Sequence, residues 1–81
     1  MATVAVQFFA SYADLIGQSR MTVSVPDPAT VRDLLTSVRC LPRGAGIPET
    51  ALVAVNRRFA NAGDPIVASD ELALIPPVAG G

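Results

Sequence analysis

The chain has 81 residues, 51% of them hydrophobic, and a formal net charge of −1. That length allows one small domain with a thin stability margin, and the absence of a basic stripe argues against nucleic acid as a partner. No apolar run approaches the roughly 20 residues of a membrane span, and no signal-peptide pattern is present. We therefore expect a cytoplasmic location and no membrane contact.

The chain lacks the side chains that most often carry catalysis. It has no histidine, and its six basic residues are all arginines, so no lysine amine is available to form a Schiff base. The single cysteine, Cys40, allows neither a disulfide nor a paired-cysteine metal site, and we interpret it as structural. We expect a protein that is not an enzyme by itself and that binds no metal and no cofactor.

The first third of the chain predicts two strands and a short helix. Alternating apolar residues predict strands over 3–9 and 21–25. Between them, 10–16 has the apolar spacing of a short helix, which Gly17 can end in the left-handed conformation. The short connection favours antiparallel pairing of the two strands.

The strongest helix signal runs from Thr30 to Cys40. Thr30 is a candidate N-cap, and Asp33, three residues later, completes a capping box. The apolar residues of this segment recur at helical spacing and predict a stripe that faces the core, made of Val31, Leu34, Leu35 and Val38.

The second half predicts three more strands separated by loops. We expect a loop over 41–50, a strand over 51–55, a turn at 56–58 and a very short strand that begins at Phe59. Residues 61–71 are predicted to be mostly loop, and 72–75 form the last strand. These elements indicate an α+β fold of two layers, a mixed five-stranded sheet covered on one face by one main helix. The first and last strands are expected side by side at its centre.

The strand alternation predicts an apolar patch on the uncovered face of the sheet. If Val4, Val6 and Phe8 face the helix, Phe9 faces the other way, and Ile75 does so after Leu72 and Leu74. We expect a partner-binding patch of Phe9, Phe59 and Ile75. The alternative is that one of the three belongs to the core and the others are isolated surface residues.

The last six residues predict an extended arm beyond a domain that spans 1–75. Prolines remove backbone donors and stop helices and central strands, and glycines let a backbone enter a narrow site. The arm, 76–81, would reach about 20 Å, and its terminal α-carboxylate would be unhindered. Its residues are Pro76, Pro77, Val78, Ala79, Gly80 and Gly81.

Several segments together resemble one family. They are the opening Val-Gln-Phe-Phe-Ala, the helix start Ala-Thr-Val-Arg-Asp-Leu-Leu, the strand Val-Ala-Val-Asn and the ending Asp-Glu-Leu-Ala-Leu-Ile-Pro-Pro-Val-Ala-Gly-Gly. In order and spacing they are similar to the MoaD family, the small subunit of molybdopterin synthase. The resemblance covers nearly the whole chain and implies a ubiquitin-like β-grasp fold.

The resemblance also implies a role as a sulfur carrier. An E1-like, MoeB-like adenylyltransferase would use ATP to activate the carboxylate of Gly81, and sulfur would then replace AMP to give a thiocarboxylate. The arm would enter a MoaE-like large subunit, within a heterotetramer, and donate sulfur for the dithiolene of molybdopterin. The apolar interface of the family carries over to Phe9, Phe59 and Ile75, whereas Arg57 and Arg58 match no family motif.

Other functions share the same features. A sibling sulfur carrier for thiamine, cysteine or tRNA thiolation would have the same fold and the same glycine ending. A protein modifier conjugated to lysines would use the same adenylate, and a plain interaction module would carry an inert tail.

Overall fold

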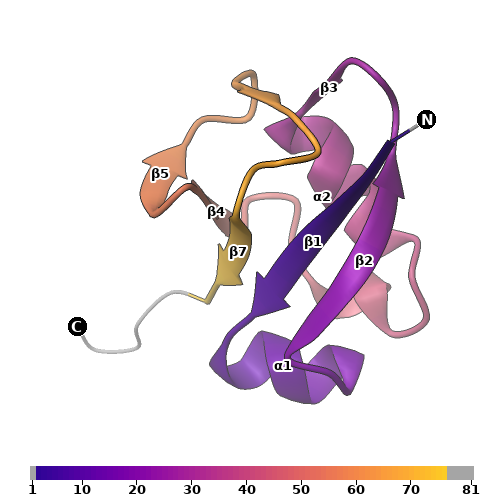
Figure 1. Cartoon of the computed structure of the whole chain (residues 1–81). Coiled ribbons are helices and arrows are strands. Elements are labelled where there is room, and N and C mark those ends of the chain that lie inside the picture. Colours follow the sequence, from indigo (N-terminus) through magenta and orange to yellow (C-terminus); the bar gives the residue numbers. More distant parts are fainter. Residues whose placement is uncertain (1, 77–81) are drawn as a thin grey trace.

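Alternating burial along the first strand divides the molecule into two sides. In β1 (Ala2–Phe8), Val4, Val6 and Phe8 are buried, and the residues between them are exposed. Successive side chains of a strand point to opposite faces, so this strand has one face in the core and one face in solvent. The computed structural model, which describes residues 2–76, extends this division across a whole sheet (Figure 1).

The remaining elements alternate short strands with two helices and one 3₁₀ turn. In chain order they are α1 (Ala10–Ile16), β2 (Arg20–Val25), β3 (Ala29–Thr30), α2 (Val31–Arg39), η1 (Gly44–Gly46), β4 (Leu52–Val55), β5 (Arg58–Ala60), β6 (Pro65–Ile66) and β7 (Leu72–Ile75).

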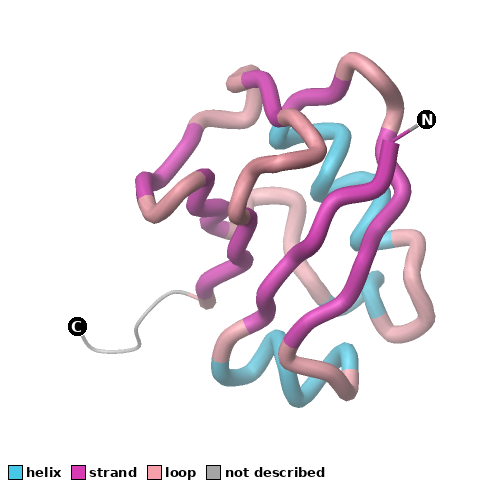
Figure 2. The backbone as a smooth tube through the Cα atoms, in the orientation of Figure 1, coloured by secondary structure: helices cyan, strands magenta, loops and turns pink. Residues whose placement is uncertain are grey.

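Five of the strands form one mixed sheet in the order β2-β1-β7-β4-β5. β1 and β7 pair in parallel, and all the other neighbours pair antiparallel. The prediction that the first and last strands lie side by side is confirmed, as is the antiparallel pairing of the first two strands. Helix α2 lies behind this sheet, and α1 crosses its lower end (Figures 1 and 2). This is the β-grasp arrangement.

The core lies between α2 and the inner face of the sheet. The predicted stripe of α2 is buried, and Leu34 and Val38 have no exposed surface. Leu74 of the sheet is equally buried. Each such side chain contributes roughly 1.5–3 kcal/mol by leaving water, so this helix–sheet contact is the main source of stability.

The start of α2 and the end of α1 lie where local chemistry predicts. In the capping box of α2, Thr30 Oγ1 accepts a hydrogen bond from the Asp33 amide at 3.3 Å, and Asp33 Oδ2 accepts one from the Thr30 amide at 2.9 Å. Gly17 ends α1 at φ 91°, in the left-handed region that glycine adopts without strain.

Two segments predicted as loops contain regular structure. β6 lies inside 61–71 and pairs with β3 as a separate two-stranded sheet, in which Ala29 and Ile66 are buried. Two-residue strands are too short to show alternation, so the sequence pattern could not reveal them. η1 lies inside 41–50, and Ile47, which follows it, is fully buried.

The predicted arm is largely untested by the structure. Pro76 follows β7 directly and is half-buried. Pro77, Val78, Ala79, Gly80 and Gly81 lie outside the described residues, so the arm and its boundary stay a prediction. Within residues 2–76, no helix is long and apolar enough to cross a membrane.

One buried polar group, the hydroxyl of Tyr12, lacks a hydrogen-bond partner among the described residues. Tyr12 of α1 is only 6% exposed. A buried hydroxyl without a partner costs about 1–3 kcal/mol. Burial also raises the pKa of Tyr12 above its ordinary value of 10.0, because the phenolate would lose its hydration.

We therefore expect Tyr12→Phe to unfold at the same or a higher denaturant concentration than the wild type at neutral pH. Since the folded-state pKa lies above the unfolded value, the contribution of Tyr12 to stability should be constant below about pH 10 and be lost above it, so the difference in stability between the wild type and Tyr12→Phe should change only above about pH 10. Urea unfolding at several pH values measures both effects. Tyr12 is the single tyrosine, so its ultraviolet titration is an independent check, and a normal pKa there would contradict the buried environment.

Candidate functional site

The outer face of the sheet carries a row of residues set by strand register. Gln7 of β1 lies opposite Ala73 of β7, Ala73 lies opposite Ala54 of β4, and Ala54 lies opposite Phe59 of β5. Side chains directly opposite each other on one face are neighbours. Two alanines therefore occupy the middle of this row, between larger residues.

The small central side chains leave a hollow of about 420 Å³, which we call the outer-face hollow. The residues that line it come from β1, β7, β4, β5 and the segments that join them: Gln7, Phe9, Ala54, Arg57, Phe59, Glu71, Ala73 and Ile75. Phe9, Phe59 and Ile75, which the alternation places on this face, thus lie around one feature of the surface. Whether they bind a partner stays a prediction.

The large apolar residues of the hollow are only partly buried. Phe9 is 40% exposed and Phe59 is 69% exposed, whereas Ile75 is half-buried. Phe8, one residue before Phe9, is 2% exposed, so the two adjacent phenylalanines divide between core and surface. An apolar hollow rimmed by polar groups is typical of an interaction site.

Sequence reasoning missed one apolar residue at this edge. Leu52 of β4 is 45% exposed and lies opposite Ile75, so it extends the apolar surface beyond the hollow. The signal was present, because Leu52 alternates with buried Val53, but the strand is too short for its facing to be fixed from sequence alone.

A charged pair borders the hollow on the side of the β4–β5 turn. Arg57 Nε lies 3.6 Å from Glu71 Oε2, and the two side chains are 87% and 56% exposed. The neighbouring Asn56 is tied to the segment before β7, since its amide donates to the Glu71 carbonyl at 2.7 Å and its side chain contacts Asp70 and the Glu71 amide. Arg57 matches no family motif, and it lies at this border of the hollow.

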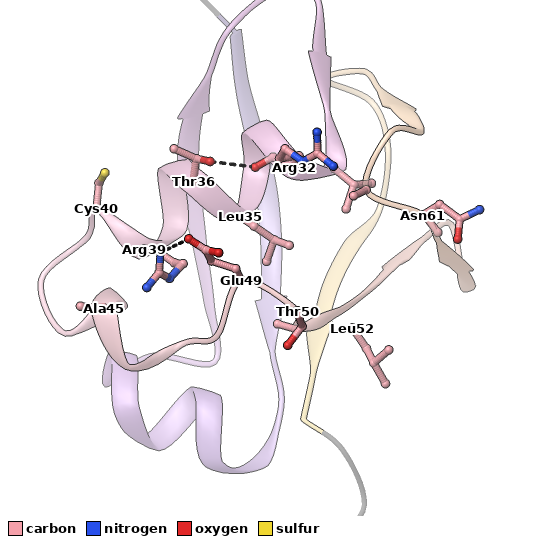
Figure 3. A pocket seen from close by; sticks show the side chains of 14 residues that line it. Arg32, Leu35, Thr36, Arg39, Cys40, Ala45, Glu49, Thr50, Leu52 and Asn61 are labelled. Atoms are coloured by element: carbon pink, nitrogen blue, oxygen red, sulfur yellow. Dashed lines mark hydrogen bonds and ion pairs between the residues drawn. The ribbon is translucent and has the colours of Figure 1, made fainter.

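A larger groove of about 820 Å³ lies between α2, the loop that precedes β4 and the end of β5 (Figure 3). Arg39 crosses it, with Nε donating to the Ile47 carbonyl at 2.8 Å and one terminal nitrogen 3.2 Å from Glu49 Oε1. These two interactions of Arg39 connect the loop to α2, so the role of Arg39 and Glu49 is structural. None of the residues predicted to bind a partner lines this groove.

Cys40 belongs to the rim of the same groove. It is the C-cap of α2 and is exposed, with its sulfur directed away from the Arg39–Glu49 pair (Figure 3). The interpretation of Cys40 as a buried structural cysteine is therefore wrong about its burial. Within residues 2–76, no group of three or more histidine, cysteine or acidic side chains could hold a metal ion.

Known proteins are similar to this chain over its whole length. Two curated relatives, the molybdopterin synthase sulfur carrier subunits of Caenorhabditis elegans and Homo sapiens, are each 29% identical over the full chain, covering 100% and 97% of their own lengths. Among solved structures, SAMP1 (small archaeal modifier protein 1) of Haloferax volcanii matches with a TM-score of 0.83 and 29% identity over 99% of this chain and 100% of its own.

A family model supports the same assignment. The model described as the ThiS family matches residues 6–81, nearly the entire chain. The match begins within β1, at Val6, and includes both helices and β7. The chain therefore belongs to the ThiS family.

Proposed function

We propose that this chain is the sulfur carrier subunit of a molybdopterin synthase. The observation that carries the proposal is the full-length identity of 29% with two relatives of that name, which spans the domain and the segment beyond it. The outer-face hollow supports the proposal, because an exposed apolar surface gives such a subunit a place to bind another protein.

The proposed chemistry takes place at the carboxylate of Gly81. A carboxylate oxygen attacks the α-phosphorus of ATP and pyrophosphate leaves. A sulfur nucleophile equivalent to hydrosulfide then attacks the carbonyl carbon of the resulting acyl adenylate, and AMP leaves to give a thiocarboxylate. The chain has no histidine, no lysine and no glycine-rich phosphate loop of the P-loop type, so activation falls to a separate E1-like enzyme.

The domain would position this reactive end rather than act on it. β7 lies in the middle of the sheet and runs directly into Pro76, and Ile75 lines the outer-face hollow. A large subunit bound at the hollow would therefore sit at the point from which the segment 76–81 departs. We propose that this large subunit accepts the segment and holds the pterin precursor that receives the sulfur.

The likeness to a small archaeal modifier protein favours one alternative, a modifier joined to lysines of other proteins. Because this chain has no lysine, it could not form chains linked through its own side chains, and each target site would gain a single copy. Denaturing gels of cell extract distinguish the two functions, since a ladder of conjugates indicates a modifier and one free band indicates a carrier.

The terminal glycine provides the first test. On incubation with the activating enzyme, ATP and a sulfur source, the intact mass of the chain should rise by the difference between a sulfur and an oxygen atom. Deleting Gly81 should abolish this shift and leave the unfolding curve unchanged, because the buried cluster of the core lies between Val4 and Leu74. No mass shift in the intact chain would eliminate a sulfur-carrier function.

Phe9→Asp provides the second test. A charge placed among the apolar anchors should weaken binding to the large subunit by at least about tenfold. Phe9 makes no side-chain cap bond at the start of α1 and is 40% exposed, so the free energy of unfolding should change by less than about 1 kcal/mol. Calorimetry of binding and urea unfolding measure the two quantities.

The matched control is Phe8→Ala, which removes the neighbouring ring from the core side. It should cost about 3–5 kcal/mol of stability, the usual range for a buried phenylalanine. If Phe9→Asp destabilises the free chain as much as it weakens binding, Phe9 is a core residue and the hollow is not an interface.

A further inference from the structure

Only one of the two adjacent arginines borders the outer-face hollow. Arg57 lies in the two-residue turn between β4 and β5 and lines the hollow, whereas Arg58 is the first residue of β5 and does not. Both carry the same charge and both are exposed. The chain therefore offers two equal charges at neighbouring positions, one at the hollow and one outside it.

Arg57 occupies a backbone position that suits glycine. Asn56 and Arg57 have φ values of 52° and 71°, as the central residues of a type I′ turn require. Asparagine tolerates this conformation, but the second position is usually glycine, because a Cβ atom there meets the backbone. An arginine at this position therefore makes the turn less stable than a glycine would.

The contacts of the Arg57 side chain contribute little stability to offset this cost. Its Nε lies 3.6 Å from Glu71 Oε2, beyond the roughly 2.7–2.9 Å of a charge-assisted hydrogen bond. With both side chains more than half exposed, such a pair contributes little to stability. Within residues 2–76, the Arg57 side chain makes no other ion pair or hydrogen bond.

The backbone that carries Arg57 is nevertheless held firmly. Asn56 is fixed by hydrogen bonds of 2.7 Å and 2.9 Å to Glu71 and of 2.9 Å to Asp70. The turn thus fixes the point on the rim of the apolar hollow from which the Arg57 side chain extends, so the backbone of the turn loses little conformational entropy on binding.

We propose that Arg57 is a specificity-determining residue: its guanidinium binds a carboxylate of the large subunit that lies beside the apolar group filling the hollow. This inference rests on the proposed function and names the chemistry that the partner must present. The planar guanidinium presents paired N–H donors that match the two oxygens of a carboxylate. Arginine is enriched at interfaces and glutamate depleted, which favours Arg57 over Glu71 as the contacting charge.

The test compares Arg57→Gly, Arg57→Gln and the matched control Arg58→Gln. Binding of each to the large subunit is measured by calorimetry at about 20 mM and about 300 mM salt, where screening differs strongly. At low salt both Arg57 variants should bind roughly tenfold more weakly, and salt should weaken their binding less than that of the wild type. Arg58→Gln should stay within about twofold of the wild type.

Thermal unfolding of the free chains provides the second measurement. Arg57→Gly should unfold at a higher temperature than the wild type, because glycine adopts the left-handed turn position freely, and Arg57→Gln should unfold at about the same temperature. If Arg57→Gly gains stability while it loses affinity, the lost affinity cannot be a result of poorer folding.

The outcomes distinguish this inference from the function on which it rests. If the wild-type chain binds the large subunit and Arg57→Gln binds equally well, or if Arg58→Gln loses as much affinity as Arg57→Gln, Arg57 is not the contact and the inference is wrong. If the wild-type chain shows no binding at all, the proposed function fails and the inference fails with it.

Discussion

The parallel pairing of β1 with β7 is the constraint on which the rest of the structure depends. In this register Phe8 lies opposite Leu74, and both are buried. The Phe9 amide, one residue on, donates to the Leu74 carbonyl at 3.3 Å, so Phe9 and Ile75 follow together onto the outer face. One pairing thus places the core, the hollow and the start of the C-terminal segment. A slip of one residue would exchange the two faces of β1 or β7.

The boundaries of the helices and the facing of β1 could be predicted from local sequence patterns. Thr30 and Asp33 identify the start of α2 through a capping box, and Gly17 identifies the end of α1 through its left-handed conformation. The alternation around Phe8 and Phe9 separates core from surface, because the strand is long enough to show a period of two. Wherever an element has enough residues to repeat, its sequence carries the necessary information.

The remainder depends on contacts between distant segments. The pairing of β3 with β6 involves two residues on each side, so no period exists to read, and tertiary contacts decide it. The position of Arg57 at the hollow follows from a turn conformation and from the approach of Glu71, fourteen residues later in the chain. Cys40 is the C-cap of α2 and is exposed, since it lies outside the helical stripe that faces the core, whereas composition alone favours burial for a lone cysteine.

Two of the groups that the structure leaves exposed lie at the outer-face hollow. Phe59 is exposed to water at the hollow, and Arg57 occupies a turn position that favours glycine. Neither contributes much to folding, and both would gain by contact with a partner that excludes water from the hollow. In a domain this small, residues that can be substituted without disturbing the core are best suited to provide affinity for a partner, so the surface, rather than the interior, should decide what this domain binds.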